Sequence, residues 1–416
     1  MTLTGQYPSR RTAGKWLAAG LLACGGGRAM AATPADILMD GHVHITNRLY
    51  WEKIDAWQAQ DRGWDFARAW QSGVNCIIEN VGTHGYWNYN YSPKQTLRLL
   101  ETIHAFAERH ADKLTIALNA ADARKIIAAG RMAIFLGCEA GWDTEGDSDV
   151  LAAFHRLGLR TVQFATQTGF NAFVDSAAAP LNGQPVDRYQ GLNTRGRALV
   201  AKMNELGILI DITHASESAQ RQIITASRAP VVASHETLAA VSGAGLADDL
   251  VKALAAKGGV IGIHGAAAVV GKRYRKWLAD NPDKAKQSSA ASFAMLSHKA
   301  ADIRAPGDHG EYITEFDAET ERLIRAVGEW KEFPEAVPLI PTADEWAEHV
   351  DHVIKTAGAD HVAIGLDMTA GRSGVPANAG GYGELVAALK RVTTSQNVRK
   401  ITGENWLRAL DQAKAV

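Results

Sequence analysis

The sequence lacks a cysteine framework, a long apolar run and an excess of charge of either sign. Three cysteines in 416 residues are too few for a disulfide scaffold, and no internal repeat or low-complexity tract is present. The 44 basic and 45 acidic residues give a net charge of −1. This balance argues against a nucleic-acid binder, which would carry a basic excess or stripe. What remains is a 46% apolar chain, long enough for two ordinary domains or one large barrel.

The first 31 residues are predicted to be a twin-arginine-type signal peptide that is removed from the mature protein. Ser9-Arg10-Arg11 is an arginine pair, the weakly apolar run Trp16–Cys24 follows, and Ala29-Met30-Ala31 is a small-x-small cleavage site. This leader holds four basic residues and no acidic one, so the remaining chain has 40 basic and 45 acidic residues. The apolar run is too short for a membrane helix, which needs ~20 residues. We therefore expect export to the bacterial periplasm and no transmembrane helix.

The cysteines add an alternative to this expectation. Leu21-Leu22-Ala23-Cys24 resembles a bacterial lipobox, so the alternative is a lipoprotein anchored through a lipid on Cys24. Cleavage after Ala31 leaves Cys76 and Cys138, both inside apolar strand-like runs. We expect these two residues to be buried free thiols rather than a disulfide.

Short β-rich runs alternate with longer helical runs through residues 32–416, which predicts a single α/β domain with a parallel sheet. The candidate strands are Ile37–His44, Val74–Asn80, Met132–Glu139, Thr161–Ala165, Ile208–Thr213, Pro230–Ser234, Gly259–His264 and His361–Asp367. The helical runs between them include Leu97–His110, Asp149–Leu157, Thr194–Leu206 and Glu217–Ser227. Eight strands alternating with helices in one chain favour a (β/α)8 TIM barrel.

The seventh and eighth strands are unusually far apart in the sequence. The segment between them, about 272–346, is charged, mostly helical in pattern and interrupted by Pro306, Pro334, Pro338 and Pro341. We expect a helical insertion at the barrel mouth. It would serve as a lid, pocket wall or oligomer contact, or it would be a solvated insertion that takes no part in catalysis.

Residue types that bind metals recur at the expected strand ends. In Asp40-Gly41-His42-Val43-His44, strand alternation places the carboxylate and both imidazoles on one face. The other strand ends carry Glu139, His214, His235, His264 and Asp367. Barrel active sites form at the C-terminal strand ends, and converging imidazoles and carboxylates suit a cation such as Zn²⁺. One strand-end histidine is more often structural, but five strand ends with ligand residues predict a metal centre, with His264 in a structural or supporting role.

The remaining histidines are interpreted less specifically. His84 follows the second strand and is a candidate for the pocket wall. Five others lie in amphipathic helical runs with charged neighbours, which predicts solvated faces. These are His104, His110, His155, His349 and His352.

With these residues in place, the chain resembles the membrane (renal-type) dipeptidase family of the metal-dependent amidohydrolase superfamily, over roughly residues 37–411. Asp40–His44 is similar to the family's opening Asp-Gly-His-Asn-Asp, and Gly137–Gly141 to its Glu-Gly-Gly segment. The longest similarity covers Gly191–His214 and continues through Ala229–His235, with the two histidines at the family's spacing. Asp360–Asp367 and Ile401–Leu407 resemble the closing blocks.

The resemblance implies a hydrolase with two zinc ions per chain that cleaves the amide bond of a dipeptide or small modified peptide. Carried over by position, His42 and His44 would bind one ion, His214 and His235 the other, and Glu139 would bridge them. A hydroxide shared by the ions would attack the carbonyl, with Asp367 as acid/base. Family members are often dimers, so a homodimer is also implied.

Three departures from the family pattern concern the site. His44 stands where the family usually has Asp, which keeps a ligand and removes one negative charge. The segment after the fourth strand lacks the histidine that contacts the substrate carbonyl in many members, so Thr166 or Gln167 would fill that space. The arginine expected soon after His235 is missing, and Arg372 is the candidate carboxylate anchor in its place. We therefore expect an intact metal centre with a remodelled substrate pocket.

Two alternative functions remain open at this point. The same metal barrel could act on a lactone or a cyclic amide, which assays of dipeptides against lactones and imides would separate. The second alternative is a non-hydrolytic periplasmic maturation factor that binds a peptide-like product. The lost histidine and arginine motivate this reading, whereas the retained ligand set and Asp367 oppose it.

Overall fold

The computed structural model describes residues 36–414, apart from 61–62, 83–90, 140–141, 144, 166–170, 178–186, 288–317, 319–320, 323–324, 326–330 and 369–372. Asp36–Val416 form one compact unit. The predicted leader with Cys24 lies outside the described residues. So do His84, Thr166, Gln167 and Arg372, and the interpretations given to all of these residues stay predictions.

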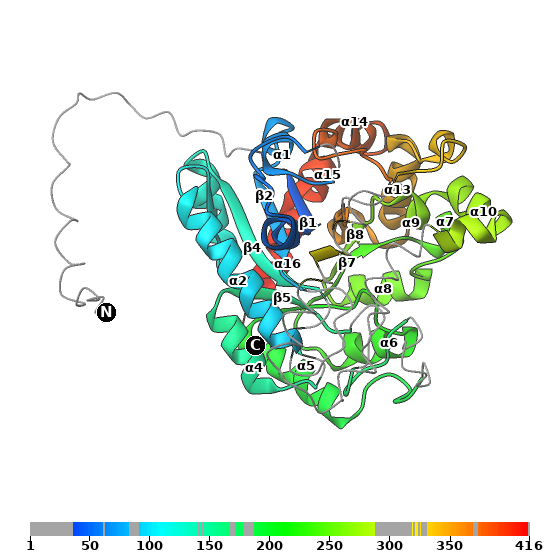
Figure 1. Ribbon diagram of the computed structural model, residues 1–416. Coiled ribbons are helices and arrows are strands. Elements are labelled where there is room, and N and C mark those ends of the chain that lie inside the picture. The colour runs from blue at the N-terminus through cyan, green and yellow to red at the C-terminus, as the bar shows by residue number, and fades with distance from the viewer. Residues whose placement is uncertain are drawn as a thin grey trace, which may run out of the picture. The chain divides into compact units, whose positions relative to one another are not determined.

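Among the described residues the sheet has nine parallel strands, and the eight of its main order each overlap a strand expected from the sequence (Figure 1). In sheet order they are β1 Met39–Val43, β2 Cys76–Asn80, β4 Met132–Cys138, β5 Leu159–Gln163, β6 Leu209–Asp211, β7 Val231–Glu236, β8 Val260–Ile263 and β9 Val362–Ile364. The sheet nearly closes, because Asp367 N–H, just after β9, donates to the His42 carbonyl in β1 over 3.2 Å. The predicted (β/α)8 TIM barrel is therefore confirmed.

One strand escaped the sequence analysis. β3, Leu114–Ile116, pairs in parallel with the first half of β4, beside the main order of the sheet. Its three residues are too few to show a period of two, so no strand could be recognised from its pattern.

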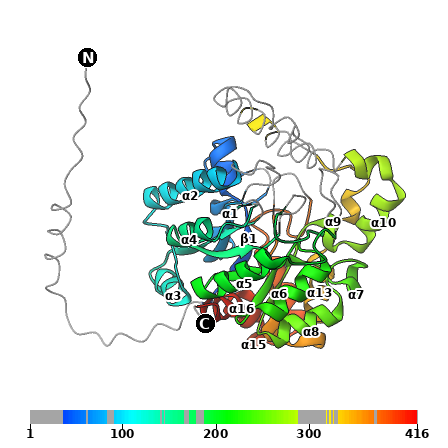
Figure 2. The same ribbon diagram turned by 90° about the horizontal axis from the view of Figure 1, so that it is seen from below.

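Helices surround the strands, as Figures 1 and 2 show. They are α1 Phe66–Gln71, α2 Tyr91–Arg109, α3 Ala120–Ala128, α4 Ser148–Arg156, α5 Thr194–Leu206, α6 Glu217–Ala226, α7 Ala239–Ser242, α8 Asp248–Ala256, α9 Ala267–Val270, α10 Lys272–Asp280, α13 Ala343–Ala357, α14 Tyr382–Val392, α15 Ser395–Arg399 and α16 Asn405–Gln412. Local signals define several ends. The Asn193 side chain caps α5 by accepting from Gly196 N–H, and Gly207 ends it at a φ of 73°. Thr342 and Glu345 form a capping box at α13.

The two faces of the strands pack against different partners. Alternate strand residues such as Ile78, Phe135 and Val232 form one buried cluster, which also takes in residues of α3 and α16. The intervening residues, such as Ile77 and Leu136, pack with the other helices in a larger cluster. Near the C-terminal ends of the strands, the first of these faces becomes polar. Two or four residues beyond its apolar members lie Asn80, Glu139, Asp211, Ser234 and His264. Alternation thus carries the apolar face directly into the candidate site.

The predicted insertion is described only in part. α10 contributes Tyr274 to a small apolar cluster with Ala267 and Ala336, and Tyr274 donates to Glu332 over 2.7 Å. Most of 288–330 lies outside the described residues, so the roles suggested for the insertion stay predictions.

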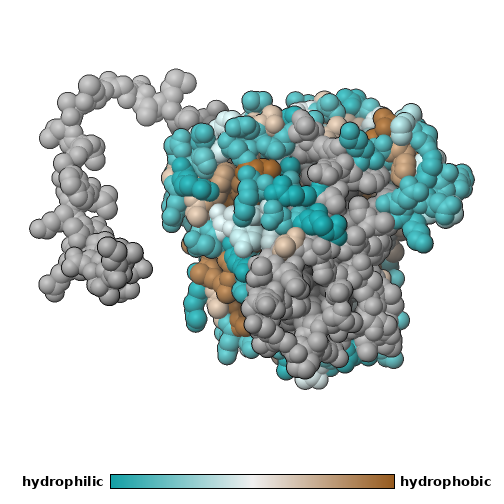
Figure 3. Space-filling model, viewed as in Figure 1, coloured by the Kyte–Doolittle hydropathy of each residue, from teal (hydrophilic) through white to brown (hydrophobic). Residues whose placement is uncertain are grey.

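The surface of the described part is largely hydrophilic on the face shown in Figure 3, where brown covers only small areas. Its exposed large apolar side chains come from separate elements, for example Trp70 in α1 and Leu157 after α4. Among the described residues, no helix has both the length and the apolar character that crossing a membrane requires. Cys76 and Cys138 are buried free thiols, as expected.

Candidate metal centre

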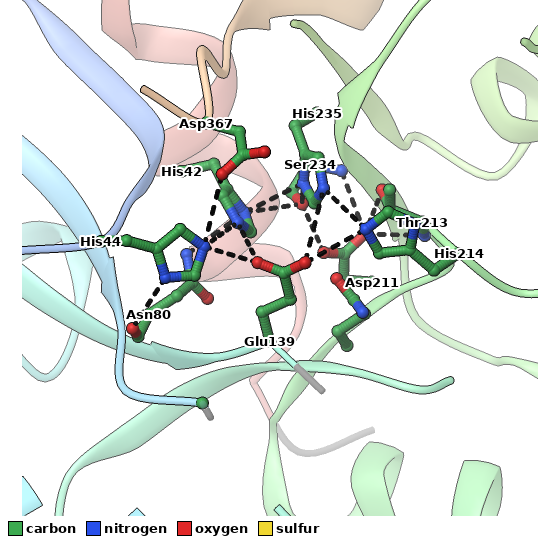
Figure 4. A network of polar contacts seen from close by, with 12 residues as sticks. His42, His44, Asn80, Glu139, Asp211, Thr213, His214, Ser234, His235 and Asp367 are labelled. Atoms are coloured by element: carbon green, nitrogen blue, oxygen red, sulfur yellow. Dashed lines mark hydrogen bonds and ion pairs between the residues drawn. The ribbon is translucent and has the colours of Figure 1, made fainter. Parts of the chain in front are cut away.

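The predicted ligand residues meet at the C-terminal ends of the strands. Figure 4 shows the Glu139 carboxylate in the middle, with His44 on one side, His214 on the other and Asp367 above. Four residues contribute nearly enclosed side chains, at most 5% exposed: His42, His44, Glu139 and His235. The His214 side chain is 22% exposed. The open side of the cluster is therefore at His214.

The first group of donor atoms comes from β1 and the end of β4. The Nε2 atoms of His42 and His44 are 2.9 Å apart. Oε2 of Glu139 lies 2.9 Å from His42 Nε2 and 2.5 Å from His44 Nε2. Asn80 helps orient His44, because its backbone carbonyl lies 3.2 Å from His44 Nδ1. This contact directs the other ring nitrogen, Nε2, towards Glu139.

The second group comes from the loop after β6 and from β7. The Nε2 atoms of His214 and His235 are 3.1 Å apart, and Oε1 of Glu139 lies 3.1 Å and 3.8 Å from them. The two oxygens of the Glu139 carboxylate therefore face different histidine pairs. Glu139 is the one residue common to the two groups, as a bridging ligand must be.

The arrangement of donor atoms fits two cations. Two neutral imidazoles cannot hydrogen-bond through two bare Nε2 lone pairs, so each close N···N approach calls for a proton or a cation between the rings. Nitrogen ligands at 2.0–2.1 Å from a tetrahedral zinc ion lie roughly 3.3 Å apart. The observed separations of 2.9 Å and 3.1 Å are close to that spacing. Each cluster of donors lies within 4.8 Å.

Asp367 lies beside the first histidine pair. Its Oδ1 is 3.5 Å from His44 Nε2, and its Oδ2 is 3.3 Å from His264 Nε2. His264 Nδ1 accepts the Ala266 N–H over 3.0 Å. A neutral His264 therefore carries its proton on Nε2, the nitrogen that faces the Asp367 carboxylate. The supporting role expected for His264 agrees with this contact.

Two site residues have backbone conformations that are unusual for non-glycine residues. The φ of His214 is 66° and that of Asp367 is 47°, both in the left-handed region. Such conformations cost of order 1–3 kcal/mol and concentrate at functional sites. Here they direct two side chains back over the barrel mouth from loops beyond the strand ends.

Irregular strand pairing also re-aims side chains at the site. β1 shifts register between Asp40 and Val43, and β7 shifts between Ala233 and Glu236. In a regular strand Ser234 and His235 would face opposite sides, yet both contact His42 Nδ1, at 2.9 Å and 3.1 Å. Sequence periodicity alone could not place these neighbours together.

A buried polar network behind the ligands was missed from the sequence. Ser234 Oγ contacts Asp211, His42 Nδ1 and His235 Nδ1. Asp211 Oδ1 also accepts the N–H of Ser234 and both the N–H and hydroxyl of Thr213. The available signal was weak: a carboxylate ending β6 and a serine before the β7 histidine.

Asp40 was expected to point into the centre with the two histidines, and this expectation is wrong. Its carboxylate accepts the His42 and Leu366 N–H groups at 3.0 Å and 3.1 Å and the Tyr382 hydroxyl at 2.5 Å. Burial raises the pKa of Asp40 to about 6, although the Tyr382 hydrogen bond opposes the rise. Asp40 thus joins β1 to β9 instead of facing the ligands.

The imidazoles of the site respond to competing influences in the ion-free protein. Burial acts to lower the pKa of His44, but the charge and hydrogen bond of Glu139 outweigh it and raise the pKa to about 9. The same opposition raises the pKa of His214. Burial and the charge of His42 hold the pKa of His235 well below its ordinary value. The carboxylate therefore attracts positive charge to both sides of the centre.

His349 corrects a further expectation. It was interpreted as lying on a solvated helix face, but its side chain in α13 is fully buried. Its Nε2 faces the Val270 carbonyl at 3.2 Å and its Nδ1 faces Thr237 Oγ1 at 3.5 Å. Helical periodicity identified an amphipathic segment but placed this residue on the wrong side of it.

The parallel eight-stranded barrel, with imidazoles and carboxylates converging at its C-terminal strand ends, defines the class of metal-dependent (β/α)8 hydrolases. Within this class, the chain belongs to the membrane dipeptidase family, peptidase family M19, whose family model matches residues 28–416. The resemblance seen in the sequence is thereby confirmed, and so is the expectation of an enzyme, a metallo-dipeptidase. The family implies metal ions, for which the described residues provide the donor groups.

Individual relatives agree with this membership. Dipeptidase verJ from Clonostachys rogersoniana is 25% identical over 359 residues, which cover 83% of this chain and 72% of the relative. The solved structure of the probable dipeptidase PvdM from Pseudomonas aeruginosa gives a TM-score of 0.72 at 20% identity, covering 91% of this chain and 96% of that one. A metallo peptidase from Rhodobacter sphaeroides, solved with a phosphinate mimic of the dipeptide L-Ala-D-Ala, gives 0.65 at 20% identity, covering 91% and 99%. At these identities the two solved structures support the fold alone.

Proposed function

We propose that this protein is a binuclear zinc-dependent dipeptidase that cleaves the amide bond of a dipeptide or a small modified peptide. One observation carries the proposal: the two oxygens of Glu139 each face a different pair of histidine Nε2 atoms, and Asp367 lies next to one of those pairs. His42 and His44 would hold one ion, and His214 and His235 the other. When bound, the ions supply Lewis acidity to the substrate carbonyl and to the attacking water.

Asp367 is the residue we assign to proton transfer. Its carboxylate is 4% exposed and lies 3.5 Å from His44 Nε2, and as general acid/base it would take a proton from the attacking water and return it to the leaving amine. His264 supports this role, because its Nε2 atom lies 3.3 Å from Oδ2 and its proton there would favour one orientation of the carboxylate. The left-handed backbone of Asp367 holds the side chain over the site at some cost in stability.

Fewer described residues bear on the choice of substrate than on the metal centre. The R. sphaeroides protein was solved with a mimic of L-Ala-D-Ala, so a dipeptide with a D-residue at its second position is the first substrate to test. The residues proposed to replace the missing substrate contacts, Thr166, Gln167, His84 and Arg372, lie outside the described part. Export through the twin-arginine leader, the alternative lipid on Cys24 and a homodimer likewise stay proposals.

The experiment is a hydrolysis assay of zinc-loaded mature protein against L-Ala-L-Ala, L-Ala-D-Ala, a lactone and a cyclic imide. We expect release of free amino acids from at least one dipeptide. Asp367→Asn should lower that rate by about 10²–10⁴, the usual contribution of a general acid or base, while the zinc content stays the same. Hydrolysis of the lactone or imide but of no dipeptide would support the alternative in which the same metal barrel acts on a lactone or a cyclic amide. Dipeptide binding without any cleavage would favour the maturation factor.

A further inference from the structure

Within the described site, the Ser234 hydroxyl contacts one histidine of each pair at its Nδ1 atom, whereas Glu139 contacts both pairs at Nε2 atoms. The hydroxyl lies 2.9 Å from His42 Nδ1 and 2.8 Å from His235 Nδ1, and it bonds to Asp211 Oδ2. All four side chains are at most 5% exposed, so water does not compete for these contacts. Figure 4 shows Ser234 between these two rings, on the side away from Glu139.

The hydrogen-bond inventory of a hydroxyl determines how these contacts are shared. A serine hydroxyl has one proton to donate and two lone pairs to accept with. Asp211 behaves as an acceptor, because its Oδ1 already receives Ser234 N–H, Thr213 N–H and the Thr213 hydroxyl at 2.9–3.0 Å. Ser234 therefore donates to Asp211 Oδ2. Its two lone pairs can accept from the two Nδ1 atoms, which lie 3.1 Å apart, when both rings carry their proton on Nδ1.

This sharing has a consequence for the opposite nitrogen of each ring. A neutral imidazole with its proton on Nδ1 presents a bare lone pair on Nε2. His42 Nε2 faces Glu139, and His235 Nε2 faces His214, the other histidine of its pair. The Asn80 amide nitrogen is placed 3.2 Å from His42 Nδ1, so a proton on that ring nitrogen requires the amide group to be turned, with its oxygen towards the ring.

We propose that Ser234 is a positioning residue that selects the metal-binding tautomer of His42 and His235 at the same time, with Asp211 directing its hydroxyl. The inference deepens the proposed function, on which it rests, because it takes the Nε2 atoms as ligands. One buried hydroxyl thereby prepares both halves of the centre. The donor set of His42, Asp211 and His235, which lies within 4.8 Å, is accordingly filled by this hydroxyl and needs no cation of its own.

The first test is Ser234→Ala, with zinc affinity measured by titration and zinc content by elemental analysis. Loss of an outer hydrogen-bond partner of a metal ligand costs about 10–100-fold in affinity, and we expect this loss at both positions. Ser227→Ala is the matched control. Its hydroxyl is buried and bonded to Asn204 and the Ala229 carbonyl, away from the site, so both zinc affinities should stay as in wild type.

The second test, Asp211→Asn, distinguishes tautomer selection from a general structural role. The asparagine oxygen would keep the three donors at Oδ1, and its NH₂ group would donate to Ser234 Oγ. The hydroxyl would then have to donate its own proton to one ring, leaving that ring with a protonated Nε2. We expect the variant to fold, shown by a wild-type circular dichroism spectrum, and to bind one zinc ion instead of two. Nitrogen-15 NMR of the metal-free wild type, in which no zinc ion fixes the tautomer, should show His42 and His235 as Nδ1–H tautomers.

The outcomes separate this inference from the proposed function. Wild-type affinity at both positions in Ser234→Ala, or Nε2–H tautomers of His42 and His235 in the metal-free wild type, would overturn the inference and leave the dipeptidase proposal intact. A wild-type protein that binds two zinc ions but cleaves no peptide would overturn the dipeptidase proposal. The zinc titrations of Ser234→Ala would still test the role of Ser234. A wild-type protein that binds fewer than two ions would overturn both.

Discussion

Two regions of this barrel contain buried histidines, and the histidines have different roles in the two regions. At the strand ends, His42, His44 and His235 face other imidazoles and a shared carboxylate at 2.5–3.8 Å. In α13, the equally buried His349 faces one backbone carbonyl and one hydroxyl. Burial alone therefore does not distinguish a ligand from a structural residue. The distinction lies in what each ring nitrogen meets: converging lone pairs call for a cation, whereas a carbonyl is satisfied by a single N–H.

The change expected to have the largest effect is Glu139→Gln. Glu139 is the side chain that faces both histidine pairs, so we expect more than the ~10–100-fold loss of zinc affinity that an outer partner costs, at both positions, together with loss of hydrolysis. Zinc titration and the peptide assay measure this.

Glu79→Gln is its matched control. Glu79 is also a buried strand-end carboxylate, but it accepts the Ile45 and Thr46 N–H groups at 2.8–2.9 Å. Burial raises the pKa of Glu79 to about 7, so a neutral side chain suits the position. Retention of both ions in Glu139→Gln, or their loss in the control, would contradict the assignment of the bridge.

A smaller effect is expected when a substitution removes a histidine from only one of the two groups of donors. His44→Ala and His214→Ala each remove one donor from one group, so each variant should bind one zinc ion where wild type binds two. His44→Asp is the comparison for the first, because a carboxylate is also a zinc ligand and should preserve both ions. Elemental analysis gives the stoichiometry. Loss of both ions in either alanine variant would show that the two positions are filled only together.

The smallest effect concerns His349 and appears only in acid. Burial lowers its pKa to about 4, against about 6.5 in the unfolded chain. Between these values the unfolded state binds the proton and the folded state does not, so stability is fully present above pH 6.5 and is lost as the pH falls towards 4. The full difference is worth about 3 kcal/mol.

His349→Gln keeps a donor for the Val270 carbonyl and removes the titration. Its free energy of unfolding should fall less steeply between pH 6.5 and 4 than that of wild type. Both proteins are measured by denaturant unfolding with a chelator present, so that the metal centre contributes equally. If the free energy of unfolding has the same pH slope in both proteins, His349 lies on a solvated helix face, as its helical pattern suggested.

The outcome for individual residues shows how far the pattern of the sequence extends. Strand ends could be located from β-rich runs, and His42, His44, Glu139, His214, His235 and Asp367 were found there because barrel strands share one C-terminal edge. β3 was too short for its period to show. Asp40 has the same alternation as His42. After a register shift in β1, however, its carboxylate accepts the Tyr382 hydroxyl and does not face the other ligand candidates.

Ser234 marks the limit of the sequence more sharply. Its neighbour His235 was recognised from its residue type, although a regular strand that turns Ser234 towards the site would turn His235 to the opposite side. The irregular pairing of β7 brings both residues to the same centre, and only the fold places Asp211 and His42 around the hydroxyl. A serine has no distinctive pattern of its own, so its role depends on partners that are 23 and 192 residues away.

The sequence by itself determined the order of the eight main strands, the metal-binding residue types gathered at their ends and the family, because these depend on local periodicity and on residue types at recurring positions. The tertiary structure alone decided which oxygen of Glu139 faces which histidine pair, how Asp367 is held and which partner each ring nitrogen meets. Those features are set by distances of about 3 Å between residues far apart in the chain, and a hydrogen bond or a coordination bond forms only at such distances.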